Sequence, residues 1–149
     1  MGYAGQHQQQ PMPSEGGVFK HAWFRYWRQD AIGCVKCYGS GKIGEAKCSR
    51  CSGSGSVARY HLIRKKAATK VVEAPDCRRF GIVDLAFSTK TSADYTVITA
   101  WAATPDAEMV LLDMDRRRLE GPDIIPAIQT MSMKWHLDYV GIEEIGRAS

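Results

Sequence analysis

The second half of the chain shows the hydrophobic patterns of regular secondary structure. A nearly continuous apolar run is typical of a central strand, and three β-branched or apolar runs follow it. These runs predict strands at 79–87, 95–104, 108–115 and 139–144. Pro105 and Asp106 lie between the second and third runs and predict a tight hairpin turn.

The segment between the third and fourth runs has the spacing of a helix with one apolar face. The apolar stripe consists of Ile124, Ile128, Met131 and Trp135. Asp123 is the predicted N-cap, which places Pro126 in the first turn, where its missing N–H costs nothing. Three strands, a helix and a strand together predict an α/β domain with a mixed sheet.

The first half has a different texture. Residues 1–17 are polar and contain Gln, Pro and Gly, which is typical of a linker or tail. Residues 18–27 are rich in aromatic and basic side chains, which either pack on a core or stack on bases. Residues 33–56 are rich in Gly and Ser and hold four of the five cysteines. We therefore divide the chain into a linker at 1–32, a cysteine insert at 33–56 and a domain at 57–149.

Composition places the chain among globular proteins, with 44% hydrophobic residues. No apolar run approaches the roughly 20 residues of a membrane span. The N-terminal sequence MGYAGQHQQQ lacks the apolar core of a signal peptide. We expect a soluble intracellular protein with no membrane partner.

Charge is distributed unevenly along the 149 residues. Residues 1–70 carry 12 Lys and Arg against 3 acids, a net of +9, and residues 71–149 carry 8 against 13, a net of −5. A basic half of this kind is a candidate for contact with nucleic acid, and a solvated basic surface is the alternative. The basic run in this half that we assign to DNA binding is Arg64, Lys65 and Lys66.

The cysteine insert is an internal duplication of the pattern CxxCxGxG. The four cysteines are Cys34, Cys37, Cys48 and Cys51. Two CxxC pairs joined by a short hairpin supply four thiolates in the tetrahedral arrangement that Zn²⁺ prefers, and four Cys ligands indicate a structural site. Disulfides and unpaired thiols are the alternatives, and an intracellular location disfavours the first. Cys77 stands apart and is expected to be a small core residue.

One acidic residue lies inside a predicted strand, and others lie next to strand ends. Asp84 lies within the first apolar run and Glu143 at the end of the last one. If those strands are neighbours, the two carboxylates converge at one sheet edge and can share Mg²⁺ or Mn²⁺; a buried salt bridge is the alternative for Asp84. Asp94 precedes the second strand and either joins them or caps the turn. Asp113 and Asp115 precede three arginines, which predicts a surface ion-pair network.

Three stretches of the second half resemble the C-terminal nuclease domain of the large terminase subunit of tailed phages. The stretches are RFGIVDLAFSTKTSADYTVITAWA, LLDMDRRRLEGPDIIPAI and YVGIEEIG. The preceding GGVFKHAWFRYW resembles the segment that links the ATPase domain of that subunit to its nuclease. The resemblance runs from about residue 8 to the end and is interrupted by the insert, which itself resembles half of the zinc domain of DnaJ-type co-chaperones.

The resemblance implies an RNase H-like fold and an endonuclease that cuts concatemeric DNA with two Mg²⁺ or Mn²⁺ ions during genome packaging. By matching position, Asp84 is the first-strand acid that bridges both metals, Glu143 is the second acid and Asp94 is an accessory acid. Lys90, in the loop before Asp94, is a candidate for steering phosphate, with a solvated loop residue as the alternative.

The implied partners are double-stranded DNA, the terminase ATPase domain, the small terminase subunit and the portal, in the cytoplasm of an infected bacterium. The third catalytic acid of the family lies downstream of the strand that carries Glu143, and its ATPase motor precedes the nuclease. The resemblance therefore implies a truncated nuclease. A catalytically inactive zinc module that binds DNA or protein is the alternative function, and another enzyme of the same fold is a further one.

Overall fold

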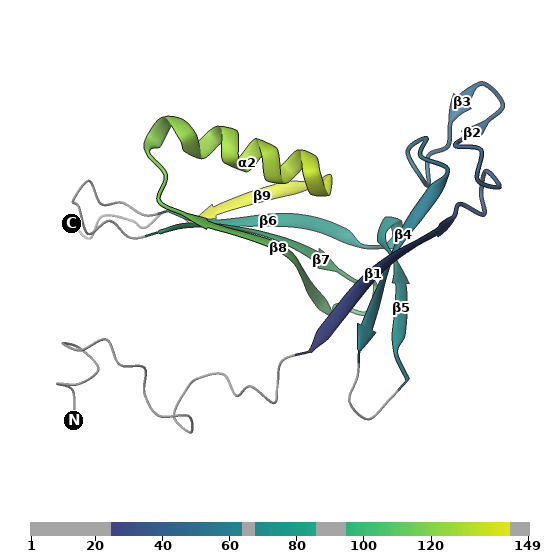
Figure 1. Ribbon diagram of the computed structural model, residues 1–149, viewed down its shortest axis with the longest axis horizontal. Coiled ribbons are helices and arrows are strands. Elements are labelled where there is room, and N and C mark those ends of the chain that lie inside the picture. Colours follow the sequence, from purple (N-terminus) through teal and green to yellow (C-terminus); the bar gives the residue numbers. More distant parts are fainter. Residues whose placement is uncertain (1–24, 64–67, 86–94, 144–149) are drawn as a thin grey trace.

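The computed structural model describes residues 25–63, 68–85 and 95–143 (Figure 1). In chain order the elements are β1 (Tyr26–Gly33), β2 (Lys42–Ile43), β3 (Ala46–Lys47), β4 (Ser56–Ile63), β5 (Lys70–Glu73), the 3₁₀ turn η2 (Ala74–Asp76), β6 (Arg78–Asp84), β7 (Thr96–Ala103), β8 (Met109–Arg117), α2 (Gly121–Trp135) and β9 (Tyr139–Glu143). No helix among these residues is long and apolar enough to cross a membrane.

The larger sheet has the strand order β8-β7-β6-β9. β6 pairs antiparallel with β7 and parallel with β9, and β7 pairs antiparallel with β8. The connection from β8 to β9 therefore crosses the sheet, and α2 provides this crossover on one face (Figure 1). The predicted mixed α/β sheet is confirmed, and each of its four strands overlaps the run that predicted it.

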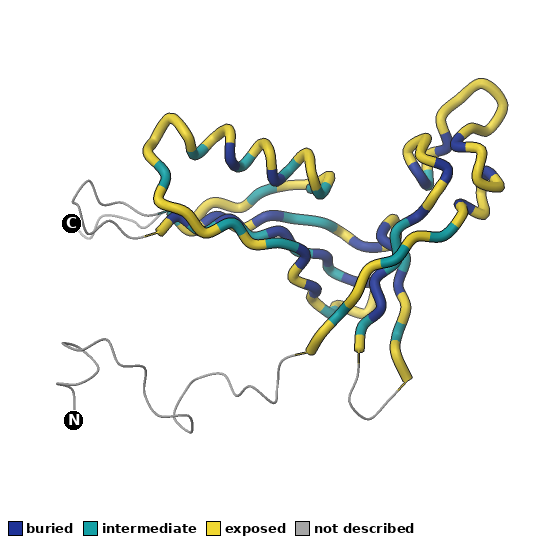
Figure 2. Tube along the Cα trace, viewed as in Figure 1, coloured by how far each residue is buried: buried dark blue, intermediate teal, exposed yellow. Residues whose placement is uncertain are grey.

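Alternate residues of the central strands form the core beneath α2. Along β7, the four buried residues are Thr96, Ile98, Ala100 and Ala102. On the facing side of α2, Ala127 and Met131 are buried, and the partly buried Ile128 and Trp135 pack against the same cluster. Figure 2 shows the buried positions of α2 on its sheet side and the exposed ones on its outer side. The predicted apolar stripe of the helix is confirmed for Ile128, Met131 and Trp135.

The hairpin between β7 and β8 turns at Pro105 and Asp106, as predicted. The Ala107 N–H donates to the Thr104 carbonyl at 2.9 Å, and the Thr104 N–H donates to the Glu108 carbonyl at 2.9 Å. Ala107 has a φ of 62°, so the turn is followed by one left-handed residue, a common three-residue hairpin loop.

The helix begins earlier than predicted. Its N-cap is Glu120, so Asp123 lies within the first turn and Pro126 lies inside the helix. Pro122 explains the difference, because a proline in the first turn lacks only an N–H that has no helical acceptor there. Asp123 still stabilises this end, because its carboxylate lies near the positive end of the helix dipole.

A β-bulge interrupts the pairing of β7 with β8 between Ala100 and Trp101. Val110 is the register partner of Ala102, and Asp113 is the register partner of Ala100. Both partners belong to the buried face of β7, although Val110 and Asp113 are three residues apart. The bulge therefore reverses the in-out alternation of β8 beyond Leu112.

A second sheet, of order β1-β4-β5, crosses one end of the larger sheet (Figure 1). The Trp27 ring packs edge-on against Tyr60, with 5.4 Å between centroids, and its Nε1 donates to the Leu111 carbonyl at 2.8 Å. Lys70 of β5 pairs with Glu108 at 2.6 Å. β1 and β4 pair across the domain boundaries placed at 32/33 and 56/57, and the three-part division itself stays a prediction.

A charge network joins β1 to β4. Arg59 binds both carboxylate oxygens of Asp30, at 2.9 and 2.7 Å, and His61 Nε2 lies 2.9 Å from Oδ2 of Asp30. The hydrogen bonds from Arg59 hold the pKa of Asp30 at about 2, below its ordinary value of 3.8, and the contact with His61 acts in the same direction.

We expect Asp30→Asn to destabilise the protein at neutral pH. The native pKa of Asp30 is depressed, so its ionisation contributes stability above about pH 4, and this contribution is lost as the pH falls toward 2. Urea unfolding of both proteins between pH 7 and pH 2.5 should show the difference shrinking with acid. A difference that stays constant over this range would contradict the assignment.

The core beneath α2 can be tested with two methionines of the same helix. Met131 is 6% exposed and Met133 is 69% exposed. Met131→Ala should lower the free energy of unfolding by about 2 to 3 kcal/mol, because it removes buried atoms and leaves a cavity. Met133→Ala should change it by less than about 0.5 kcal/mol. Denaturant unfolding measures both, and equal effects would contradict the placement of the helix face.

Candidate metal centre and acidic pair

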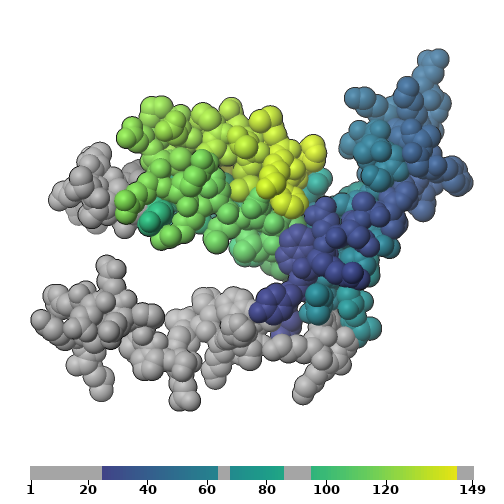
Figure 3. Space-filling model, in the orientation of Figure 1, coloured from purple at the N-terminus to yellow at the C-terminus, as the bar shows by residue number. Residues whose placement is uncertain are grey.

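The cysteine insert forms the tip of the β1–β4 ribbon. Gly33 and Ser56 are cross-strand partners at the end of the ribbon, and the insert leaves and re-enters between them. It contains the small hairpin of β2 and β3 and projects away from α2 and the larger sheet (Figures 1 and 3).

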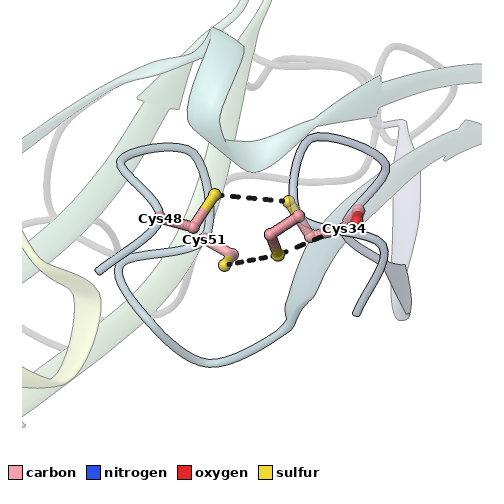
Figure 4. A group of neighbouring side chains, drawn as sticks. Cys34, Cys48 and Cys51 are labelled. Atoms are coloured by element: carbon pink, nitrogen blue, oxygen red, sulfur yellow. Dashed lines mark hydrogen bonds between the residues drawn. The ribbon is translucent and has the colours of Figure 1, made fainter. Parts of the chain in front are cut away.

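The four cysteine sulfurs meet at the centre of this insert (Figure 4). All four residues are buried, between 0% and 8% exposed, and the ligand atoms lie within 4.8 Å of one another. Sγ of Cys34 lies 3.8 Å from Sγ of Cys48, and Sγ of Cys37 lies 3.7 Å from Sγ of Cys51. Four sulfurs bound tetrahedrally to zinc at about 2.3 Å are about 3.8 Å apart, so the cluster is positioned to bind a metal ion and fits zinc.

The two CxxCxGxG repeats have the same backbone structure and exchange hydrogen bonds. The Cys34 N–H donates to the Gly55 carbonyl, and the Cys48 N–H donates to the Gly41 carbonyl, both at 2.8 Å. Within each repeat a serine hydroxyl donates to the carbonyl of the second cysteine, at 2.7 Å from Ser40 and 2.8 Å from Ser54. The duplicated sequence therefore folds as a pseudo-twofold pair around the sulfurs.

Two glycines are required where the repeats touch. A Cβ on Gly41 would lie 2.3 Å from the Gly53 carbonyl oxygen, and a Cβ on Gly55 would lie 2.3 Å from the Gly39 carbonyl oxygen. Both also have φ near 76°, which side chains disfavour. The Gly41 N–H points at Sγ of Cys37, at 3.3 Å, and helps to hold a thiolate there.

The surroundings shift the pKa values of the cysteine thiols in opposite directions. Burial raises the pKa of the Cys34 thiol to about 11. Burial also acts to raise the pKa of Cys51, but hydrogen bonds from the backbone of Gly55 and Gly53 outweigh it and lower that pKa to about 6. A cation at the centre removes this conflict, because it stabilises all four thiolates together.

Arg50, between the third and fourth cysteines, fastens the insert to the second sheet. Its Nη2 lies 2.6 Å from Glu73 at the end of β5 and 3.0 Å from Asp76 of η2. No local sequence pattern predicts this role of Arg50, because its partners lie more than 20 positions away.

We expect the purified chain to contain about one equivalent of zinc, and Cys48→Ser to remove it, because three thiolates bind zinc far more weakly than four. Cys77→Ser is the matched control. Cys77 is buried in the main core, as predicted, and lies outside the cluster, so this variant should retain its zinc. Elemental analysis of proteins purified under reducing conditions measures both. Equal zinc contents of wild type and Cys48→Ser would rule out the site.

Asp84 and Glu143 lie side by side on neighbouring parallel strands, where they are direct register partners. The neighbour relation on which the shared metal site depended is therefore observed. The strand that carries Asp84 was predicted to run to residue 87, but β6 ends at Asp84, and this residue is exposed. Within the described part of the chain neither carboxylate has an ion pair, so the salt-bridge alternative for Asp84 is not observed. Their role as metal ligands stays a prediction.

The acids of β8 separate into two groups. Asp115 pairs with Arg117 at 2.6 Å, as the predicted ion-pair network requires. Asp113 pairs with α2 instead: it accepts hydrogen bonds from Nζ of Lys134 at 2.6 Å and from Nε1 of Trp135 at 2.8 Å. These bonds lower the pKa of Asp113, with Lys134 as the largest cause.

Several predicted site residues lie outside the described residues. They are Asp94, Lys90, Arg64, Lys65 and Lys66. Their assigned roles stay predictions.

Comparison with protein-family models, with curated proteins and with solved structures finds no match to this chain. The functional argument therefore depends on the geometry of the cysteine centre and the acidic pair.

Proposed function

We propose that the chain belongs to a metal-dependent DNA endonuclease of the phage terminase large-subunit kind, with an RNase H-like sheet and with Asp84 and Glu143 as its metal-binding pair. The observation that carries the proposal is the register of these two acids on β6 and β9. The strand order β8-β7-β6-β9, with α2 as the crossover, supports it.

The pairing of two carboxylates needs a physical explanation. Neighbouring strands lie about 4.8 Å apart, and like charges directly opposite each other destabilise a sheet. Both acids are exposed, and among the described residues neither has a cationic partner. A divalent cation that binds oxygen from both side chains would convert this repulsion into a binding site.

In the proposed reaction Asp84 and Glu143 would hold the metal through their carboxylate oxygens. Bound Mg²⁺ or Mn²⁺ supplies a Lewis acid for the scissile phosphate and activates the attacking water. The proposed substrate is double-stranded DNA, and the proposed partners are a terminase ATPase domain, a small terminase subunit and a portal in the cytoplasm of an infected bacterium. The zinc centre is structural in this proposal, because four thiolates leave no open position.

The acidic pair is tested by Mn²⁺ binding and by nicking of supercoiled plasmid. Asp84→Asn and Glu143→Gln should each weaken Mn²⁺ binding about tenfold or more, because each removes one of two charged ligands. Electron paramagnetic resonance of free Mn²⁺ measures the affinity. Both variants should also lose Mn²⁺-dependent nicking on agarose gels.

Glu45→Gln is the control, because Glu45 is an exposed acid in the turn between β2 and β3, on the zinc-binding tip. It should bind Mn²⁺ and nick plasmid like the wild type. Wild-type nicking in Asp84→Asn would overturn the proposal.

A zinc-dependent binding module is the second candidate function. The observation that favours it is the surface of the insert, where Tyr38 is 96% exposed and Val35 is 67% exposed, close in sequence to the exposed Lys42 and Lys47. Exposed aromatic and basic side chains together are typical of nucleic-acid contacts. Plasmid binding without Mn²⁺ affinity or nicking would favour this function over the nuclease.

A further inference from the structure

We propose that Arg116 and Arg118 hold the phosphate backbone of DNA beside the acidic pair, as positioning residues on the sheet face opposite α2. This inference rests on the proposed nuclease function and adds the groups that would bind its substrate. Residues 116–118 were predicted to form a surface ion-pair network, and among the described residues only Arg117 of the three has such an ion pair.

The register of the larger sheet places Arg116 in the same row as the acidic pair. Arg116 pairs with Val97, Val97 with Asp84, and Asp84 with Glu143. Register partners in a sheet share a face, so these residues form one row across all four strands. The row reads Arg116, Val97, Asp84, Glu143. With strands about 4.8 Å apart, the backbone of Arg116 lies about 10 Å from that of Asp84.

Beyond the bulge, the alternation of β8 places Arg117 and its two neighbouring arginines on opposite faces of the sheet. Arg117 points to the α2 side, since it pairs with Thr96 of the buried face of β7 and bonds Asp115 through Nε at 2.7 Å and Nη2 at 2.6 Å. Arg116 and Arg118 therefore lie on the opposite side. Asp115 neutralises the charge of Arg117, whereas Arg116 and Arg118 lie on the other face of the sheet, away from this carboxylate.

The guanidinium groups of Arg116 and Arg118 both lie against the same aromatic ring. The Arg116 guanidinium lies 3.6 Å from the centroid of the Tyr95 ring, and that of Arg118 lies 5.1 Å from it. Neither has a carboxylate partner among the residues that the structure describes. An aromatic ring holds a guanidinium in place without using its N–H groups, so these donors remain available to phosphate oxygens.

The chemistry of a DNA strand matches this row. A phosphodiester over the acidic pair requires the metal there, and another phosphate of the same strand can bind the arginine fork. The face is open beside Asp84, since Ile82, two residues away on the same face of β6, is 44% exposed. An acidic protein partner fits less well, because it would meet Asp84 and Glu143 in the same row.

The test compares Arg116→Gln/Arg118→Gln with Arg117→Gln. Fluorescence anisotropy measures the binding of a labelled 20-base-pair duplex, with Ca²⁺ in place of Mn²⁺ to prevent cutting, from about 50 to 200 mM salt. The affinity of the double variant at low salt should be about tenfold weaker than that of the wild type. The magnitude of its slope of log affinity against log salt should be smaller by about two, one for each lost phosphate contact. Arg117→Gln should retain the wild-type slope.

Arg116→Lys/Arg118→Lys separates charge from packing. It keeps both positive charges, so its salt slope should stay near the wild-type value even if the stacking on Tyr95 weakens. A purely structural role of the arginines would instead lower the thermal midpoint and leave the slope unchanged.

The outcomes separate this inference from the proposed function. An unchanged slope in the glutamine double variant, or the absence of duplex binding by the wild type, would overturn the role of the arginines whatever Mn²⁺ does at the acidic pair. A slope reduced by about two, with unchanged Mn²⁺ affinity, supports it. If Asp84→Asn leaves Mn²⁺ binding unaltered, the nuclease proposal fails while a reduced slope still establishes the arginine contact.

Discussion

The pairing of β6 on both of its sides is the constraint on which the larger sheet depends. Its antiparallel partner β7 is joined to β8 by a short hairpin, but its parallel partner β9 is reached only by a crossover, and α2 must therefore lie on one face. Gly81 of β6 shows how closely this layer packs, since a Cβ there would lie 3.0 Å from Cδ1 of Leu137. One strand thus fixes the position of the helix, the core beneath it and the alignment of Asp84 with Glu143.

The buried core of the β1–β4 ribbon tip consists mainly of cysteine side chains instead of hydrocarbon side chains. Its buried cluster consists of the four cysteines and Val57. So few apolar side chains cannot order a segment of this length by burial alone, and a metal ion bound to the four thiolates would supply folding free energy directly. The ion pairs of Arg50 connect the tip to β5 and η2.

Local patterns predicted the strands of the larger sheet, the stripe of α2 and the cysteine cluster, because each depends on residues close in sequence. The second sheet was not predicted, since β1 is exposed at most positions and pairs with a strand distant in sequence, and β5 has only four residues. The faces of β8 were unpredictable for another reason. Val110 and Leu112 predict one alternation, and the bulge reverses it, which turns Asp113 toward Trp135 and Arg116 toward the open face.

The ends of the cysteine-containing tip have a consequence for how such a chain can change. Gly33 and Ser56 are cross-strand partners, so their Cα atoms are about 5 Å apart, a gap that a two-residue turn also closes. A segment with ends this close can be gained or lost in one event without altering the ribbon beneath it. α2 has no such freedom, because it joins strands at opposite edges of its sheet. The cysteine-containing tip is therefore a transferable unit, and the helix is an inseparable part of the architecture.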